Sequence, residues 1–216
     1  MIIVSYYTKN TGYEQEVKNL IVSCKKFGLK SDIVGIESKG RWDTNCCYKP
    51  RFLLEKLREH QSPVVWMDAD ALFLKQPTLF QTLTCDVALR TFDDLPMGHP
   101  SKIITGTLFF HYRISVFNLL EQWDIECRAM LRGEDEVWDQ VALQRALLKT
   151  PSLRLFPLPE DYYLIYDTPA HRGKTGVIVH YQASRLLKKV VNGEVVRFWG
   201  TDMLSQEQRR LFSELM

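Results

Sequence analysis

The sequence has few cysteines, and their arrangement excludes the usual cysteine-based scaffolds. It contains five in 216 residues, and the only close pair, Cys46 and Cys47, is adjacent rather than spaced as C-x-x-C. A zinc ribbon needs paired C-x-x-C spacings, and a disulfide framework needs an even set of cysteines. We therefore expect reduced thiols, as in a cytosolic protein.

Long apolar runs are also missing. No run approaches the roughly 20 residues that a membrane-spanning helix needs, and the mean hydropathy is −0.19. The first residues, Met1–Tyr7, have neither the basic start nor the long apolar segment of a secretory signal. The sequence therefore predicts no transmembrane segment and a cytoplasmic location.

An excess of charge of one sign is absent as well. The chain has 28 Lys and Arg residues against 26 Asp and Glu residues, for a formal net charge of +2. A strong basic field is the usual electrostatic sign of a nucleic-acid-binding module. We therefore expect no nucleic-acid partner.

What is present indicates one globular α/β domain over residues 1–216. No repeat and no Pro/Gly/Ser-rich linker divides the chain, and its length suits a single domain. The first half alternates strand and helix signals, which implies parallel strands joined by helical crossovers. The expected strands are 2–4, 33–34, 63–67, 87–89, 103–110 and 177–179, and the expected helices are 49–60, 116–130 and 134–148. A further helix is expected after a capping box at Thr11–Glu14, with apolar residues at helical spacing from Val17 to Cys24. Near the C-terminus, Asn192-Gly193 predicts the turn of a hairpin over 190–196, and Ser205 the start of a last helix.

The most informative feature is a pair of carboxylates, Asp68 and Asp70, directly after the apolar strand 63–67. Asp is common in turns after strands, but here an apolar run, Ala71–Leu74, follows. Two acids between apolar runs are costly unless a ligand or cation compensates them. Hard divalent cations prefer carboxylate oxygens, and ligands bind at the carboxyl ends of strands in open α/β sheets. The pair therefore predicts a divalent cation site.

Five segments, in order along the chain, resemble the GT-A glycosyltransferases, most closely the nucleotide-diphospho-sugar transferase group related to the glycogenin and bacterial galactosyltransferase family. Val64–Pro77 resembles the D-x-D segment, and Lys49–Leu54 the segment that precedes it. Thr105–Phe110 resembles the glycine-containing strand that lies against the donor. Asp139–Leu143 is similar to the D-Q-x-x-L helix, and Val177–Tyr181 to the late strand that ends in histidine.

The resemblance implies a single GT-A domain, with a Rossmann-like, mixed but mainly parallel sheet flanked by helices. Residues 1–110 would form the half that binds the nucleotide sugar, and residues 111–216 the acceptor half. The activity would be that of a hexosyltransferase of the EC 2.4 type. It would move a sugar from a nucleotide-diphosphate sugar, most simply a UDP-sugar, to an acceptor hydroxyl with retention of configuration. The acceptor could be a glycan, a lipid or a protein.

The resemblance also implies roles for particular residues. Asp68, Asp70 and His180 would hold Mn²⁺ or Mg²⁺, a set of oxygen and nitrogen ligands in which the imidazole favours manganese. Lys49 and Gly106 would lie at the donor, as would the end of the first strand, Tyr6, Tyr7 and Thr8. Asp139 would contact the donor sugar hydroxyls, and Gln140 would lie near the anomeric carbon.

Each assignment has an ordinary structural alternative. His180 could be a core histidine and Lys49 a surface lysine, and Asp139 could serve only to complement the helix dipole. The basic residues Arg185, Lys188 and Lys189 could hold the diphosphate or form a solvated surface, and Asp93 with Asp94 is a reserve pair for acceptor binding.

Two other functions use the same features. A phosphatase of the haloacid-dehalogenase type also places D-x-D after a strand, with the first Asp as nucleophile. Such enzymes have Thr or Val after the second Asp, whereas this chain has Ala71. A protein that binds a nucleotide sugar without turnover is the third hypothesis.

Overall fold

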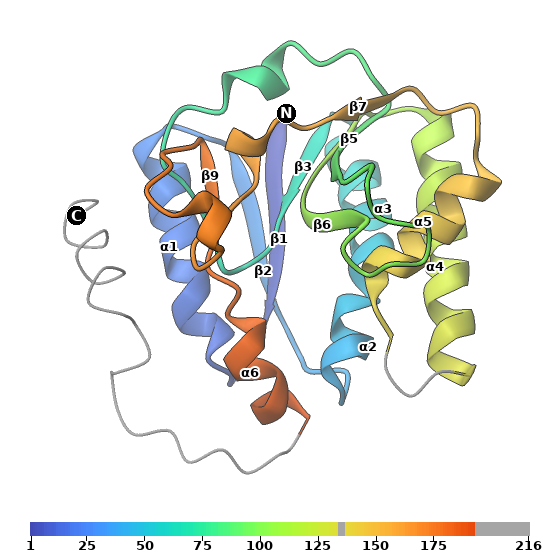
Figure 1. The fold of residues 1–216 in the computed structure, drawn as a ribbon, viewed down its shortest axis with the longest axis horizontal. Helices are drawn as coiled ribbons and strands as arrows, with labels where there is room; N and C mark the ends of the chain where they lie inside the picture. Colours follow the sequence, from blue (N-terminus) through green and yellow to red (C-terminus); the bar gives the residue numbers. More distant parts are fainter. Residues whose placement is uncertain (134–136, 193–216) are drawn as a thin grey trace.

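The computed structural model describes residues 1–133 and 137–192, which form one layered α/β unit (Figure 1). The strands are β1 Ile2–Thr8, β2 Ser31–Ile36, β3 Val64–Met67, β4 Ala71–Phe73, β5 Val87–Thr91, β6 Ile103–Phe110, β7 Leu155–Pro157, β8 Leu164–Ile165 and β9 Ile178–His180. The α-helices are α1 Tyr13–Lys26, α2 Trp42–Cys46, α3 Lys49–His60, α4 Ile114–Gly133, α5 Asp139–Lys149 and α6 Ser184–Val191. Short 3-10 helices cover Thr78–Gln81, Glu160–Tyr162 and Pro169–His171.

The main sheet has six strands in the order β2-β1-β3-β6-β5-β7. β1 pairs in parallel with β2 and β3, and β5 pairs in parallel with β7, whereas β6 runs antiparallel to both of its neighbours. This arrangement confirms the predicted α/β class with a mixed, mainly parallel sheet. The central parallel strands β1 and β3 are largely buried and begin or read as apolar runs because helices cover both faces of the sheet, whereas the edge strands β2 and β7 are partly exposed.

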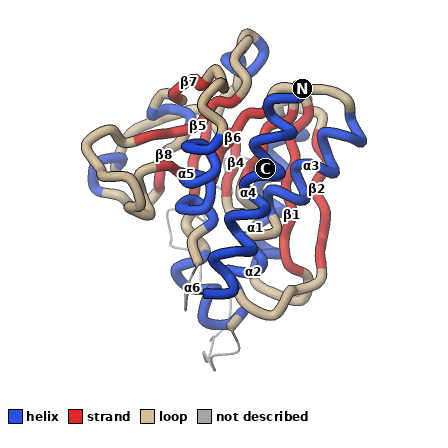
Figure 2. The backbone as a smooth tube through the Cα atoms, turned by 90° about the vertical axis from the view of Figure 1, so that its right-hand side faces the viewer, coloured by secondary structure: helices blue, strands red, loops and turns tan. Residues whose placement is uncertain are grey.

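Helices lie on both faces of this sheet, as the edge-on view of Figure 1 shows. On one face, α3, α4 and α5 pack over a core that contains the fully buried Trp123 and the nearly buried Trp66. On the other face, α1 packs together with β4 and β9 over a second core around Phe73 and Phe109. The turned view of Figure 2 looks onto the face that α4 and α5 cover, with α6 near one end of the molecule.

A second sheet of three strands, β4-β9-β8, stands beside the main one. Its first strand, β4, begins one residue after Asp70, so the chain passes from the main sheet to the small sheet through the carboxylate pair. The sequence indicated the apolar run 71–74 but not a second sheet. The short β4 pairs with β9, which lies more than 100 residues later, and such a distant pairing leaves no local sequence signal.

Two expectations for the second half need correction. Helix α5 begins at Asp139, so the expected start at residue 134 is wrong. Val137 and Trp138 precede the helix, and residues 134–136 are not described. Val190 and Val191 end helix α6, so they are not the first strand of a hairpin. A short pair of apolar residues fits a helix or a strand, and only the structure of the neighbouring residues decides between them. The remainder of that hairpin and the helix from Ser205 lie outside the described residues.

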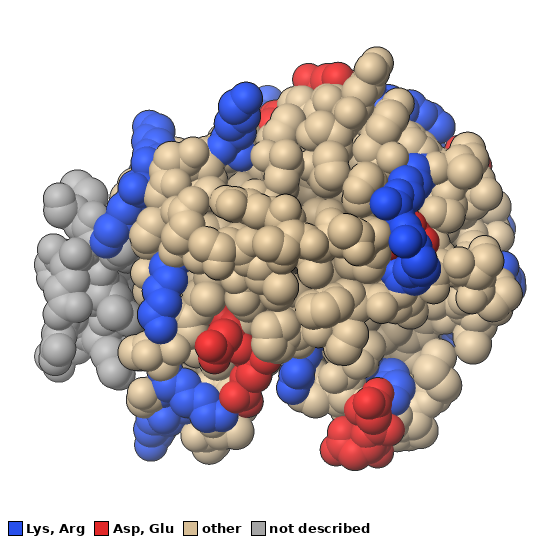
Figure 3. All heavy atoms as spheres, turned by 90° about the horizontal axis from the view of Figure 1, so that it is seen from above, with Lys and Arg blue, Asp and Glu red and all other residues tan. Residues whose placement is uncertain are grey.

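The surface that Figure 3 shows carries no wide expanse of one charge. On this face Lys and Arg side chains stand in small separate groups, several of them beside acidic side chains. Within residues 1–133 and 137–192, every helix is too short or too polar to cross a bilayer.

Helix α1 is joined to the small sheet by one buried hydroxyl. Ser23 Oγ donates to the carbonyl of Leu20 (2.9 Å) and accepts the backbone N–H of Phe73 (3.1 Å). β4 is the edge strand of the small sheet, so this bond satisfies an edge donor that is buried. Ser23 thereby helps to fix the strand that follows the carboxylate pair.

We expect Ser23→Ala to lower the free energy of unfolding by about 1–3 kcal/mol, because it leaves the Phe73 N–H buried without an acceptor. Urea denaturation followed by circular dichroism measures this change. The exposed Ser152 supplies a matched control, since Ser152→Ala should change stability by less than about 0.5 kcal/mol. Equal effects of the two substitutions would contradict the role given to Ser23.

Candidate functional site

A cavity of about 310 Å³ lies at the carboxyl ends of β1 and β3, where ligands bind in open α/β sheets. Its walls come from both halves of the chain: β1, α2, β3 and β6 from the first, and α5 and the segments around β8 and α6 from the second. Every residue that the sequence analysis placed at the donor lines this cavity, as do two of the three predicted metal ligands, Asp68 and Asp70.

The carboxylate pair is held by its surroundings. Asp68 N–H donates to the carbonyl of Gly106 on β6 (2.9 Å), and Asp68 Oδ1 accepts the indole N–H of Trp66 (2.9 Å). Asp70 is 9% exposed, and its Oδ2 accepts the N–H of Ala183 (2.7 Å) just before α6. The chain reaches that N–H through Gln182, whose backbone is left-handed (φ 55°). Both carboxylates are thus fixed at the bottom of the cavity.

His180 reaches the pair through the register of the small sheet. β9 runs antiparallel to β4, and His180 pairs with Ala71, the residue after Asp70. One ligand atom from each of Asp68, Asp70 and His180 lies within 4.8 Å of the others. The three residues that the sequence predicted as metal ligands therefore converge on one small volume.

Burial makes this cluster costly without a cation. Removal from water and the neighbouring Asp68 carboxylate raise the pKa of Asp70 to about 7. Burial lowers the pKa of His180 to about 4, so its imidazole is neutral at pH 7. A neutral imidazole is the form that binds a metal ion. A divalent cation would supply the positive charge that these oxygens lack.

Lys49 lies at the first turn of α3 and is almost completely buried. Its ammonium lies 2.8 Å from Asp139 Oδ2, 3.3 Å from Asp68 Oδ1, and 3.2 Å from both oxygens of Thr105. Burial alone would lower the pKa of Lys49, but Asp139 and Asp68 raise it above its ordinary value. Lys49 is therefore charged, and it joins the D-x-D segment to the start of α5.

Asp139 is the first residue of α5, and it is 5% exposed. Its Oδ2 accepts from Lys49 and from the hydroxyl of Thr105 (3.0 Å), and its backbone carbonyl accepts the indole N–H of Trp123 (2.8 Å). The adjacent Gln140 donates its side-chain amide to the carbonyl of Pro100 (2.7 Å). Both side chains line the cavity, as the resemblance implied.

The three residues at the end of β1 differ in their surroundings. Tyr6 packs among Tyr48, Phe52 and Trp66, and its hydroxyl donates to the carbonyl of Asn45 (2.6 Å). Thr8 is buried with its hydroxyl 3.0 Å from that of Thr11. Tyr7 is partly exposed, so its ring has more room to contact a ligand than the buried ring of Tyr6.

Two of the basic residues after His180, Arg185 and Lys188, have different neighbours. Arg185 lines the cavity and forms an ion pair with Asp167. The ammonium of Lys188 lies about 5.0 Å from the ring of Trp42 and 5.1 Å from that of Trp138. The reserve pair Asp93 and Asp94 is exposed in the loop after β5 and does not line the cavity.

Several lining residues gave no signal in the sequence. Trp42 and Trp138 meet edge to face, with ring centroids 5.6 Å apart, and the Trp42 indole donates to the Tyr13 hydroxyl (3.2 Å). The ring of Tyr163 packs 4.6 Å from that of His180. An aromatic residue in a segment without periodicity looks like any core residue, so only the folded chain identifies these four.

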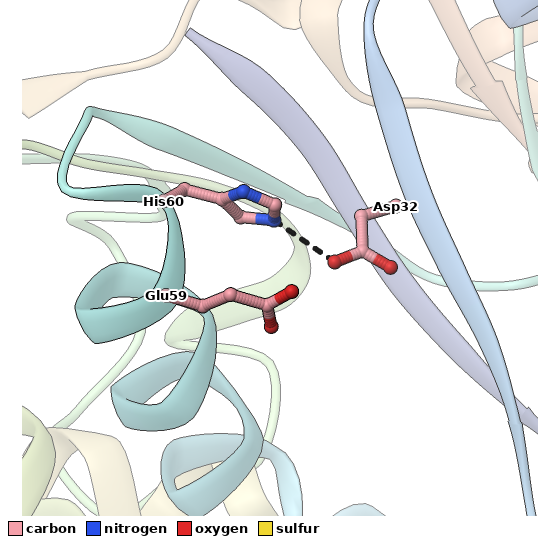
Figure 4. A group of neighbouring side chains, drawn as sticks. All are labelled: Asp32, Glu59 and His60. Atoms are coloured by element: carbon pink, nitrogen blue, oxygen red, sulfur yellow. Dashed lines mark hydrogen bonds and ion pairs between the residues drawn. The ribbon is translucent and has the colours of Figure 1, made fainter.

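A second group of potential metal ligands occurs away from the cavity. Figure 4 shows Asp32 on β2 facing Glu59 and His60 at the end of α3, with His60 Nε2 2.9 Å from Asp32 Oδ2. The Lys56 ammonium, which the figure omits, lies 2.6 Å from Asp32 and 2.8 Å from Glu59. A lysine already pairs with both carboxylates of this group, which makes it a suitable control for metal binding.

The sequence matches no protein-family model and no curated protein. The fold does have solved counterparts. One is "a glycosyltransferase involved in the glycosylation of the major capsid of PBCV-1", with a TM-score of 0.64 and 17% identity over 90% of this chain and 98% of that one. Another is the WbbM bifunctional glycosyltransferase, with a TM-score of 0.57 and 14% identity over 84% of this chain and 45% of that one. The chain therefore has a fold that glycosyltransferases use.

We expect Lys49→Met to lower the free energy of unfolding by about 3–5 kcal/mol, because it leaves the buried Asp139 carboxylate without its cation. Lys49→Met combined with Asp139→Leu removes both charges and should be more stable than Lys49→Met alone. Denaturant unfolding of the four proteins of this double-mutant cycle measures the coupling. Purely additive losses would contradict a buried ion pair.

Proposed function

We propose that this chain is a metal-dependent glycosyltransferase that moves a sugar from a UDP-sugar to an acceptor hydroxyl. One observation carries the proposal: Asp68 and Asp70, which line the cavity between β3 and β4, converge with the buried His180 of β9. The fold that the chain shares with solved glycosyltransferases supports the same reaction class. Hexosyl transfer with retention, and a cytoplasmic location, are expectations from the sequence that belong to this proposal.

The residues of the site fit a hard divalent cation. Two carboxylates and a neutral imidazole form an oxygen and nitrogen donor set that suits Mn²⁺ or Mg²⁺. Asp68 accepts from Trp66 and pairs with Lys49 through Oδ1, and Asp70 accepts from Ala183 through Oδ2, so these bonds engage one oxygen of each carboxylate. When bound, the ion would offset the negative charge that develops on the departing diphosphate.

The protein's own groups would orient the donor. Lys49 and Thr105 hold Asp139 at the cavity wall through Oδ2, where it can accept hydrogen bonds from sugar hydroxyls. Gln140 is held by the Pro100 carbonyl at the same wall, as expected for a group near the anomeric carbon. Such fixed polar groups lower the barrier by positioning the reactants.

The first test is a thermal-shift titration with Mn²⁺ and UDP. We expect UDP to raise the melting temperature only when Mn²⁺ is present. At a hundredfold excess over the dissociation constant, binding adds about 2.7 kcal/mol of stability. Asp70→Asn should abolish this shift, and transfer with it, without unfolding the protein. Asp32→Asn, in the group in which Lys56 pairs with both carboxylates, should leave the manganese-dependent shift unchanged.

Three other outcomes would contradict the proposal in different ways. No shift with any nucleotide would remove the donor site. A shift without transfer to any acceptor tested would favour a protein that only binds nucleotide sugars. Release of phosphate from p-nitrophenyl phosphate that disappears in Asp68→Asn would favour the phosphatase hypothesis, in which the first Asp is the nucleophile.

A further inference from the structure

His180 is enclosed on three sides by Thr107, Tyr163 and Gly106. The side chain of His180 is 1% exposed. Its Nε2 lies 2.8 Å from the hydroxyl oxygen of Thr107 on β6, and the ring of Tyr163 packs against its face. The backbone of Gly106 lies against the edge formed by Cε1 and Nδ1, because a Cβ there would come within 2.8 Å of Cε1 and 3.0 Å of Nδ1. The two ring nitrogens therefore face different surroundings.

Thr107 faces His180 because it lies on the same side of β6 as Phe109, in the core that includes residues of β4 and β9. On its other edge, toward β5, β6 is irregular at this point. Leu89 of β5 pairs with Leu108, but the next residue, Arg90, pairs with Ile104, so 105–107 bulge out of that pairing. A bulge redirects side chains locally, and bulges are common beside active sites. Thr105 contacts Lys49 and Asp139, while Thr107 contacts His180.

The hydroxyl of Thr107 has a second neighbour, which indicates where its hydrogen lies. Thr107 Oγ1 is 3.7 Å from Met67 Sδ on β3. A thioether sulfur can accept a hydrogen bond but cannot donate one, and a hydroxyl has one hydrogen to give. If the hydroxyl donates to Met67, its oxygen must accept from His180, and Nε2 must then carry the hydrogen. This arrangement satisfies both contacts, whereas donation to Nε2 satisfies one.

We propose that Thr107 is a positioning residue that keeps the hydrogen of His180 on Nε2, so that Nδ1, on the Gly106 side of the ring, is the nitrogen that binds the divalent cation. The inference rests on the metal centre of the proposed function. Histidine ligands commonly donate their second ring N–H to a fixed acceptor, which sets the tautomer and the ring orientation. Here a hydroxyl backed by a thioether takes the place of the more common carboxylate or carbonyl.

The direct test is the ¹⁵N NMR spectrum of His180 in the full chain, titrated with Cd²⁺ as a diamagnetic ion in place of Mn²⁺. We expect the Nδ1 resonance to move on binding, while Nε2 keeps the chemical shift of a protonated nitrogen. A metal-induced change at Nε2 instead would overturn the inference and leave the proposed metal centre intact. No response of either nitrogen would overturn both.

Two variants test Thr107 itself. Thr107→Val keeps the shape and removes the hydroxyl, and it should raise the Mn²⁺ dissociation constant about 10- to 100-fold, the usual effect of losing such a partner. Thr107→Ser restores the hydroxyl and should recover most of the affinity, as measured by calorimetry. If Thr107→Val folds with unchanged stability and binds Mn²⁺ as tightly as the parent, Thr107 has no positioning role.

Discussion

The ion pairs of Lys49 are the interaction on which the arrangement of the cavity depends. Three carboxylates, Asp68, Asp70 and Asp139, lie at one cavity, and two of them share the single buried ammonium of Lys49. Because α3 carries the lysine, β3 precedes Asp68 and α5 begins at Asp139, one cation joins three elements of the fold. The third carboxylate, Asp70, receives a backbone N–H instead, and burial together with Asp68 raises its pKa.

Under the proposed function, that unequal distribution of charge would place the metal ion at one end of the site. At the Asp139 end, lysine and a threonine hydroxyl already satisfy Oδ2, so the carboxylate is held ready for neutral hydroxyl groups. At the Asp70 end, the neutral imidazole of His180 lies beside the carboxylates of Asp68 and Asp70. Among the described ion pairs, Lys49 pairs with Asp68, and no protein cation pairs with Asp70. A sugar at the first end and a metal-bound diphosphate at the second would match this division.

The sequence predicted those features that local pattern encodes. Apolar runs and 3.6-residue spacing predicted the α/β class, the parallel strands, and helix 49–60 and strand 103–110 with the bounds that the structure shows. The prediction of a cation site rested on two acids between apolar runs. His180 required the resemblance, because its approach to Asp70 depends on the pairing of β4 with β9. Thr107 and Tyr163 could not have been found, since only the pairing of distant strands and the fold of a segment without periodicity bring them to His180.

The central claim is that Asp68, Asp70 and His180 hold one divalent cation beside a nucleotide diphosphate. The most direct measurement is anomalous diffraction at the manganese edge from crystals grown with Mn²⁺ and UDP. The account predicts a peak within bonding distance of all three side chains, with the diphosphate oxygens completing the coordination. A peak beside Asp32 and His60 with none at His180, or UDP bound in the cavity without manganese, would contradict it.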